Sequence, residues 1–181
     1  MIRALLSALL PLSAAVVASV PGDLAAAERD MTFFKSVEGQ WSGPGEVVAG
    51  KYKGTKFVCN FTGTTPAGSV GMKLDGGCRV GVFMQKMSAT IEKNGRGYSG
   101  TFLDGSAGKG LDIVSGNVVN DRKVVFGLNR RALKGAMQAR LPDNNSMVVT
   151  VSVRVETEMV PVIGVSLKRI DDGTVGSVAQ Q

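Results

Sequence analysis

The sequence predicts an all-β protein, a closed antiparallel up-and-down β-barrel of about eight to ten strands with a short N-terminal helix. Two observations lead to this fold class: short segments in which apolar and polar residues alternate, and turn-forming residues between them at regular intervals. A sheet of that many strands with one apolar face has to close or fold over to remove that face from water. A closed barrel is the simplest arrangement that does so.

The clearest strand runs from Met147 to Val155, where every second residue is apolar and Thr150, Ser152 and Arg154 lie between them. Two further segments, one from Phe83 to Ile91 and one from Leu133 to Leu141, show the same period of two. The turn signals that separate the strands are Asn94-Gly95, Asp104-Gly105, Asn120-Asp121, Asn129 and Pro142-Asp143-Asn144-Asn145. The only helix expected is the segment from Asp30 to Val37, with Asp30 as its N-cap.

The N-terminal segment has the pattern of a cleavable signal peptide. Arg3 supplies a positive charge, the residues from Ala4 to Val20 are mostly apolar, and Ala25-Ala26-Ala27 fits a cleavage signal. A transmembrane anchor is the alternative, but Pro11 interrupts the apolar run, which is shorter than the roughly 20 residues that a bilayer span needs. We therefore expect a signal peptide over residues 1–27, cleaved near Ala27, and a single β-barrel domain over residues 28–181 in the periplasm.

The chain carries a formal net charge of +6, which favours anionic partners such as lipid head groups or polysaccharide. Most charges are scattered singly, and only Arg130-Arg131 with Lys134, and Arg122-Lys123, approach a cluster. No aromatic residues interleave with these clusters, so we expect no nucleic-acid partner. Contact with a membrane surface is expected to be weak.

The two cysteines of an exported chain predict one disulfide, between Cys59 and Cys78. Cys59 alternates with Phe57 and Phe61 on the apolar face of one strand, and Cys78 shares its parity with the apolar residues of the next. A hairpin centred near Gly68-Ser69 would place the two cysteines opposite each other. Asp75-Gly76-Gly77 is a second possible turn, and two free buried thiols are the alternative to the disulfide.

The segment Val37-Glu38-Gly39-Gln40-Trp41-Ser42-Gly43 resembles the G-x-W motif that opens the first strand of lipocalins and their calycin relatives. The resemblance implies that Trp41 plugs the closed end of the barrel and that an arginine of the last strand packs across its ring. Arg169 shares the parity of Ile163, Val165 and Leu167 and therefore points inward. Stacking on Trp41 and bonds to backbone carbonyls would offset the cost of burying its charge.

Two other barrel families show related similarities. The stretch from Gly39 to Glu46 is similar to the first strand of nitrobindin-type haem barrels, which ligate haem through a histidine. This chain contains no His, so haem bound in that way is not expected. We also expect no other cofactor. The periplasmic barrel inhibitors of secreted metalloproteases share the G-x-W start and a single disulfide.

The sequence gives little support to an enzyme. Without His, a Ser-His-Asp triad and the usual zinc sites lack their members, and we expect no catalytic residue and no metal site. Glu156 and Glu158 form the closest carboxylate pair, but they precede Pro161 in a loop and should face solvent. The segment from Asp104 to Gly110 is similar to a phosphate loop, yet it lacks the first glycine and no Ser or Thr follows Lys109.

Two functions remain. The first is a periplasmic lipocalin-like protein that binds or sequesters a small apolar ligand. Its lumen would be lined by Phe57, Phe61, Phe83, Met87, Phe126, Met137 and Val151. The alternative is that these side chains fill the barrel, and that a solid barrel acts as a protein-interaction module on an envelope protein, as a protease-inhibitor-like or envelope-maintenance protein would.

Overall fold

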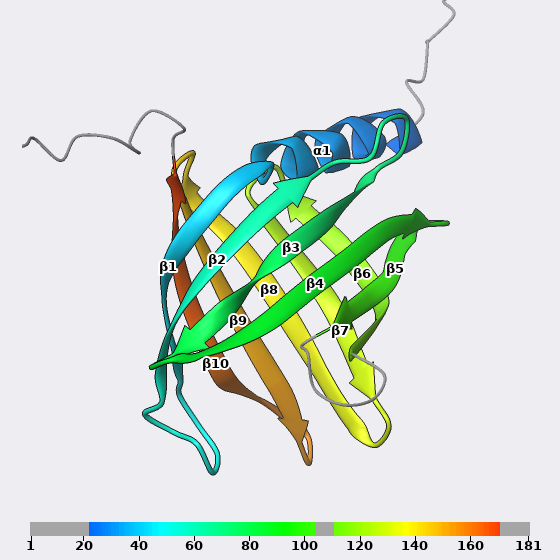
Figure 1. The fold of residues 1–181 in the computed structure, drawn as a ribbon. Helices are drawn as coiled ribbons and strands as arrows, with labels where there is room; N and C mark the ends of the chain where they lie inside the picture. The colour runs from blue at the N-terminus through cyan, green and yellow to red at the C-terminus, as the bar shows by residue number, and fades with distance from the viewer. Residues whose placement is uncertain (1–21, 104–110, 171–181) are drawn as a thin grey trace, which may run out of the picture.

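A computed structural model describes residues 22–103 and 111–170 and confirms the predicted fold class. Ten antiparallel strands form a closed barrel in which each strand pairs with its neighbours in sequence and β1 pairs with β10 (Figure 1). The elements are α1 (Gly22–Ser36), β1 (Gly39–Val47), β2 (Lys56–Thr64), β3 (Gly71–Val80), β4 (Phe83–Asn94), β5 (Gly97–Leu103), β6 (Leu111–Asn120), β7 (Lys123–Arg130), β8 (Leu133–Asp143), β9 (Ser146–Val155) and β10 (Glu158–Ile170).

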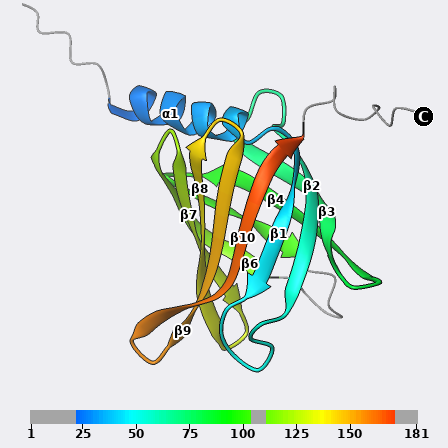
Figure 2. The same ribbon diagram turned by 90° about the vertical axis from the view of Figure 1, so that its left-hand side faces the viewer.

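The up-and-down order divides the connections between the two ends of the barrel. Helix α1 lies across one end, which we call the helix end, together with the β2–β3, β4–β5, β6–β7 and β8–β9 connections (Figures 1 and 2). The β1–β2, β3–β4, β7–β8 and β9–β10 connections lie at the opposite end, which we call the far end. The two ends therefore differ in what covers them.

The hydrogen-bonded register places every second residue of each strand inside the barrel. Trp41 lies opposite Phe61 of β2 and opposite Arg169 of β10, and Phe126 of β7 lies opposite Met137 of β8. These inward positions and the buried face of α1 supply the hydrophobic core, whose largest fully buried side chains include Trp41, Phe33, Phe34 and Phe126. The core is thus continuous from the helix into the barrel.

Two glycines at the start of β1, one in the G-x-W segment and one just after it, have structural reasons. Gly45 faces inward in β1, and a Cβ atom built there would collide with the ring of Phe57 on β2. Gly39 has a φ of +100° at the entry to β1, a conformation that residues with side chains rarely adopt. Both positions therefore require glycine, one for space and one for backbone conformation.

The predicted disulfide and its hairpin are confirmed. Cys59 and Cys78 are bonded, with their Cα atoms 4.0 Å apart, and they lie directly opposite each other in the β2–β3 register. The connection between the strands is centred where Gly68-Ser69 predicted it. The alternative turn at Asp75-Gly76-Gly77 is wrong, since these residues lie within β3.

The helix and one turn differ from the sequence-based predictions. Helix α1 begins at Gly22 and ends at Ser36, so the predicted bounds of Asp30 and Val37 are wrong and Asp30 lies inside the helix, not at its N-cap. Asn129 lies within β7, and the turn follows at Arg131. The predicted cleavage position near Ala27 falls within α1, residues 1–21 lie outside the described residues, and the signal peptide, the periplasmic location and the domain boundary stay predictions.

Candidate functional site

The helix end of the barrel is closed by a contact between Trp41 and Arg169, which the family resemblance implied and the inward parity of Arg169 supported. The guanidinium carbon of Arg169 lies 4.3 Å from the centre of the Trp41 ring, which is the geometry of a cation–π contact. Its guanidinium also donates hydrogen bonds to the backbone carbonyls of Glu38, Ser36 (2.7 Å) and Asn144 (3.2 Å). One inward arginine thus ties β10 to the segment that leads from α1 into β1.

The Trp41 side chain is itself fixed by that segment. Trp41 is fully buried, and its indole N–H donates a hydrogen bond to the carbonyl of Val37 at 3.0 Å. The polar edge of the ring is therefore satisfied while its face packs under Arg169. The arrangement fills the entrance of the barrel from the helix side.

A buried carboxylate attaches α1 to the opposite wall. Asp30 is only 1% exposed, and its carboxylate accepts hydrogen bonds from Lys93 Nζ (2.5 Å), Tyr98 Oη (2.6 Å) and Arg29 (2.9 Å). Burial alone raises the pKa of Asp30, but the hydrogen bonds from Lys93, Tyr98 and Arg29 outweigh burial and hold this pKa below its usual value. Burial and the Asp30 carboxylate raise the pKa of Tyr98, so the pair stays as carboxylate and phenol.

A chain of aromatic rings runs from the helix into the interior. Phe34 of α1 lies 5.2 Å from Tyr98 between ring centres, and Tyr98 lies 6.1 Å from Phe126 in an edge-to-face arrangement. All three side chains are buried. Side chains therefore fill the interior beneath α1.

The interior toward the far end is less completely buried than the interior beneath α1. Phe126, Met137 and Val151, three of the predicted lining residues, lie side by side in one row across β7, β8 and β9, and Ile163 of β10 extends this row. Phe126 is 2% exposed, but Met137, Val151 and Ile163 are only partly buried although they face inward. Solvent therefore reaches the row from inside the barrel.

Three other predicted lining residues face inward but lie apart from this row. Phe57 packs over Gly45, and Met87 lies next to the disulfide, with its Sδ 3.7 Å from Cys78 Sγ. Phe61 lies nearer the helix end, opposite Trp41. All three are partly buried and pack against the core.

The prediction that Phe83 lines the lumen is wrong. Phe83 has inward parity, but it is the first residue of β4, pairs with Val80 at the tip of the β3–β4 hairpin and is 79% exposed. The hairpin extends past the barrel wall at this point (Figure 2), so within residues 22–103 and 111–170 Phe83 stays largely exposed to solvent.

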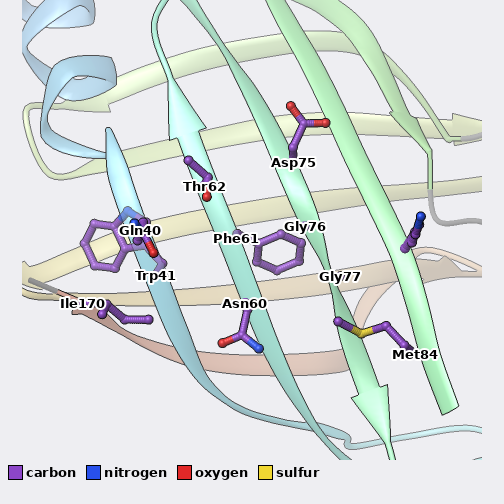
Figure 3. Close-up of a pocket in the computed structure, with 11 residues that line it drawn as sticks. Gln40, Trp41, Asn60, Phe61, Thr62, Asp75, Gly76, Gly77, Met84 and Ile170 are labelled. Carbon is purple, nitrogen blue, oxygen red and sulfur yellow. The ribbon is translucent and has the colours of Figure 1, made fainter. Parts of the chain in front are cut away.

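Two surface cavities border the barrel wall in the described part of the chain. One, of about 330 Å³, lies over Gly76 and Gly77 of β3 and is lined mainly by outward-facing residues such as Asn60, Asp75 and Lys86 (Figure 3). The other, of about 460 Å³, lies between α1 and the β2–β3 connection. Of the seven predicted lining residues, only Phe61 borders either cavity.

The remaining candidates from the sequence are a carboxylate pair and a loop similar to a phosphate loop. Glu156 and Glu158 are exposed at the β9–β10 turn, and the segment from Asp104 to Gly110 lies outside the described residues. Within residues 22–103 and 111–170, no three His, Cys, Asp or Glu side chains are grouped as a metal site would require. No helix in this part of the chain is long and apolar enough to cross a membrane.

Sequence reasoning missed the Asp30 cluster and the helix face that carries it. Asp30, Phe33, Phe34 and Val37 follow the spacing i, i+3, i+4, i+7 of one helix face, and all four are buried. That spacing was a usable signal that a carboxylate would be buried. Its partners were not predictable, because Lys93 and Tyr98 lie 63 and 68 residues further along the chain.

The fold and site define a closed ten-stranded antiparallel β-barrel capped by one helix, an architecture consistent with the calycin type. Sequence comparison with known proteins does not assign this barrel to a family. No protein-family model matches the sequence, and no curated protein resembles it significantly.

Proposed function

We propose that the protein binds a small apolar ligand inside the barrel, in the part of the lumen toward the far end. The observation that carries this proposal is the partial exposure of the inward row Met137, Val151 and Ile163. A ligand that covers these side chains gains the free energy of removing apolar surface from water, about 25 cal/mol per Å². The packed helix end would form the floor beneath it.

The chemistry of this row favours an acyl or isoprenoid chain. Its partly exposed residues Met137, Val151 and Ile163 carry thioether or aliphatic side chains, and Phe57 and Met87 add further apolar surface on β2 and β4. Methionine adapts its shape to flexible partners at little cost. The ligand class that fits such a lining is a flexible hydrocarbon chain of a single-tailed lipid.

Thermal unfolding with added lipid tests the proposal. Binding to the folded state raises the melting temperature as ligand concentration rises, so a series of fatty acids and isoprenoid alcohols should shift the wild-type transition upward. Met137→Trp should fill the row and abolish the shift. Gln138→Trp is the matched control, because Gln138 is the next residue of β8 and faces outward.

Equal shifts in Met137→Trp and Gln138→Trp would place any binding outside the lumen. No shift with any lipid, together with strong destabilisation by Met137→Trp, would mean that the row is packed. That result would favour the predicted alternative, a solid barrel that acts on an envelope protein.

A further inference from the structure

The exposed apolar side chains of the barrel are concentrated in two neighbouring segments of the far end. Residues 48–58 span the β1–β2 connection and the start of β2, and residues 79–86 span the β3–β4 hairpin tip. We call these two segments the β1–β4 rim. They make up 19 of the 142 described residues, yet they hold seven of the fifteen exposed large apolar side chains among these residues: Val48, Tyr52, Val58, Val80, Val82, Phe83 and Met84.

The hairpin tip is the most exposed part of this rim. Val82 is 89% exposed and Phe83 is 79% exposed, and the tip projects past the side of the barrel (Figure 2). Tyr52, at 67% exposure, occupies the adjacent β1–β2 connection. An aromatic and an aliphatic side chain at a protruding turn keep apolar surface in water unless a partner covers them.

The charges of the rim all have one sign. Lys51, Lys53, Lys56, Arg79 and Lys86 lie in the two segments, which contain no Asp or Glu. In the part of the chain that the structure describes, ion pairs form only at Asp30, so none of these five cations is neutralised by one. The nearest carboxylate in the register is Glu46, opposite Lys56.

We propose that the β1–β4 rim docks on the surface of an anionic lipid bilayer, with Val82 and Phe83 inserted among the lipid chains. Apolar side chains flanked by Lys and Arg are the pattern of an interfacial anchor, since the first enter the acyl boundary and the second pair with anionic head groups. The protruding shape of the tip favours a fluid bilayer over a protein as the partner. A protein would have to offer a matching pocket, whereas lipids rearrange around the inserted side chains. This proposal does not depend on binding inside the lumen.

Flotation of the full chain with lipid vesicles tests the docking. Wild-type protein should float with phosphatidylcholine vesicles that contain about 30% phosphatidylglycerol and stay behind with phosphatidylcholine alone, and salt should weaken the binding. Val82→Asn/Phe83→Asn should lower the partition coefficient at least tenfold. The matched control is Val114→Asn/Val119→Asn, which removes two apolar side chains of β6 that are also strongly exposed.

The contribution of charge is tested in the same assay. Lys51→Gln and Lys53→Gln should each weaken binding about fivefold, the effect expected for one cation near an anionic surface. Lys35→Gln and Arg96→Gln remove exposed cations from the helix end and should leave binding unchanged. Equal losses from both pairs would overturn the proposal, because binding would then follow net charge alone.

The insertion itself is tested by fluorescence. Phe83→Trp should shift its emission to shorter wavelength when the anionic vesicles are added, and Val114→Trp should not. The proposal fails if wild-type protein does not bind the vesicles at low salt, or if Val82→Asn/Phe83→Asn binds as well as wild type. It also fails if those substitutions instead abolish self-association without vesicles, since the rim would then be an interface between copies of the chain.

Discussion

The two ends of this barrel use apolar residues in opposite ways. At the helix end, Phe33, Phe34 and Trp41 are at most 1% exposed, and the polar groups among them, above all Asp30 and Arg169, have several hydrogen-bond partners. At the far end, Val82 and Phe83 extend into solvent.

This difference shows where the barrel is stabilised and where it is available to other molecules. The helix end combines dense packing with satisfied polar groups, which is what stabilises a folded domain. The far end keeps apolar surface in contact with water inside the lumen and at the rim. Removal of this surface from water would be favourable, and it requires another molecule to bind there. The proposed ligand site and the proposed membrane surface both lie at this end.

The largest loss of stability is expected from the contact between Trp41 and Arg169 that closes the helix end. Trp41→Ala should destabilise the protein by about 3–5 kcal/mol, the usual cost of removing a large buried aromatic side chain. Arg169→Ala should cost less, and the two losses should not add, because the side chains are in contact. Urea unfolding of the two single variants and the double variant measures this, and strict additivity would show that the contact contributes nothing.

Two phenylalanines compare the packed interior beneath α1, which Phe126 reaches through its contact with Tyr98, with the partly buried interior toward the far end. Phe126→Ala removes a ring that is 2% exposed and should cost about 3–4 kcal/mol. Phe57→Ala removes a ring that is only partly buried and should cost about half as much, because less apolar surface returns to water. Equal losses in urea unfolding would mean that the interior toward the far end is as tightly packed as the interior beneath α1.

Removal of the disulfide should destabilise the protein by a similar amount, because the bond restricts the conformations of the unfolded chain. The bond joins residues 19 positions apart, and the double variant Cys59→Ala/Cys78→Ala should lose about 3 kcal/mol in a chain-entropy model. Guanidinium unfolding of the oxidised and the substituted protein gives the difference. Peptide mapping without reductant should recover the two cysteines in one linked pair, and the recovery of free thiols would contradict the bond.

The Asp30 cluster should make the helix end sensitive to acid. Asp30→Asn should cost about 2–3 kcal/mol at neutral pH, since it weakens hydrogen bonds to a charged group. The pKa of Asp30 is held below its ordinary value of 3.8, so its contribution is complete above that value and is lost as pH falls through the lower pKa of the folded state. Unfolding curves of wild type and Asp30→Asn should therefore converge below pH 3.8, and curves that stay parallel would exclude the carboxylate as the cause. Tyr98→Phe, which removes one donor to Asp30, should cost about 1 kcal/mol.

The smallest effect is expected at the rim. Val82→Asn/Phe83→Asn should change the free energy of unfolding by less than about 0.5 kcal/mol, because both side chains already face solvent. A larger loss in urea unfolding would show that the hairpin tip supports the fold. It would also weaken the distinction between the two ends.

The sequence by itself determined which face of a strand each residue occupies, because this depends only on the two-residue period of the strand. Alternation placed Cys59 and Cys78 on one face and Arg169 on the inner face of the last strand, and the structure has both the bond and the stack on Trp41. Parity is local, because successive side chains of a strand point to opposite faces wherever the strand lies. The resemblance to a known family added the role of Trp41, which parity alone does not supply.

The tertiary structure alone decided positions along the barrel axis and contacts between distant segments. Phe83 has inward parity, as predicted, but its place at the tip of the β3–β4 hairpin leaves it in solvent. Asp30 lies on the apolar face of α1, but only the closed barrel brings Lys93 and Tyr98 to it. Periodicity tells which face a residue takes. Strand lengths, turn positions and barrel closure decide what lies opposite that face, and they depend on the whole chain at once.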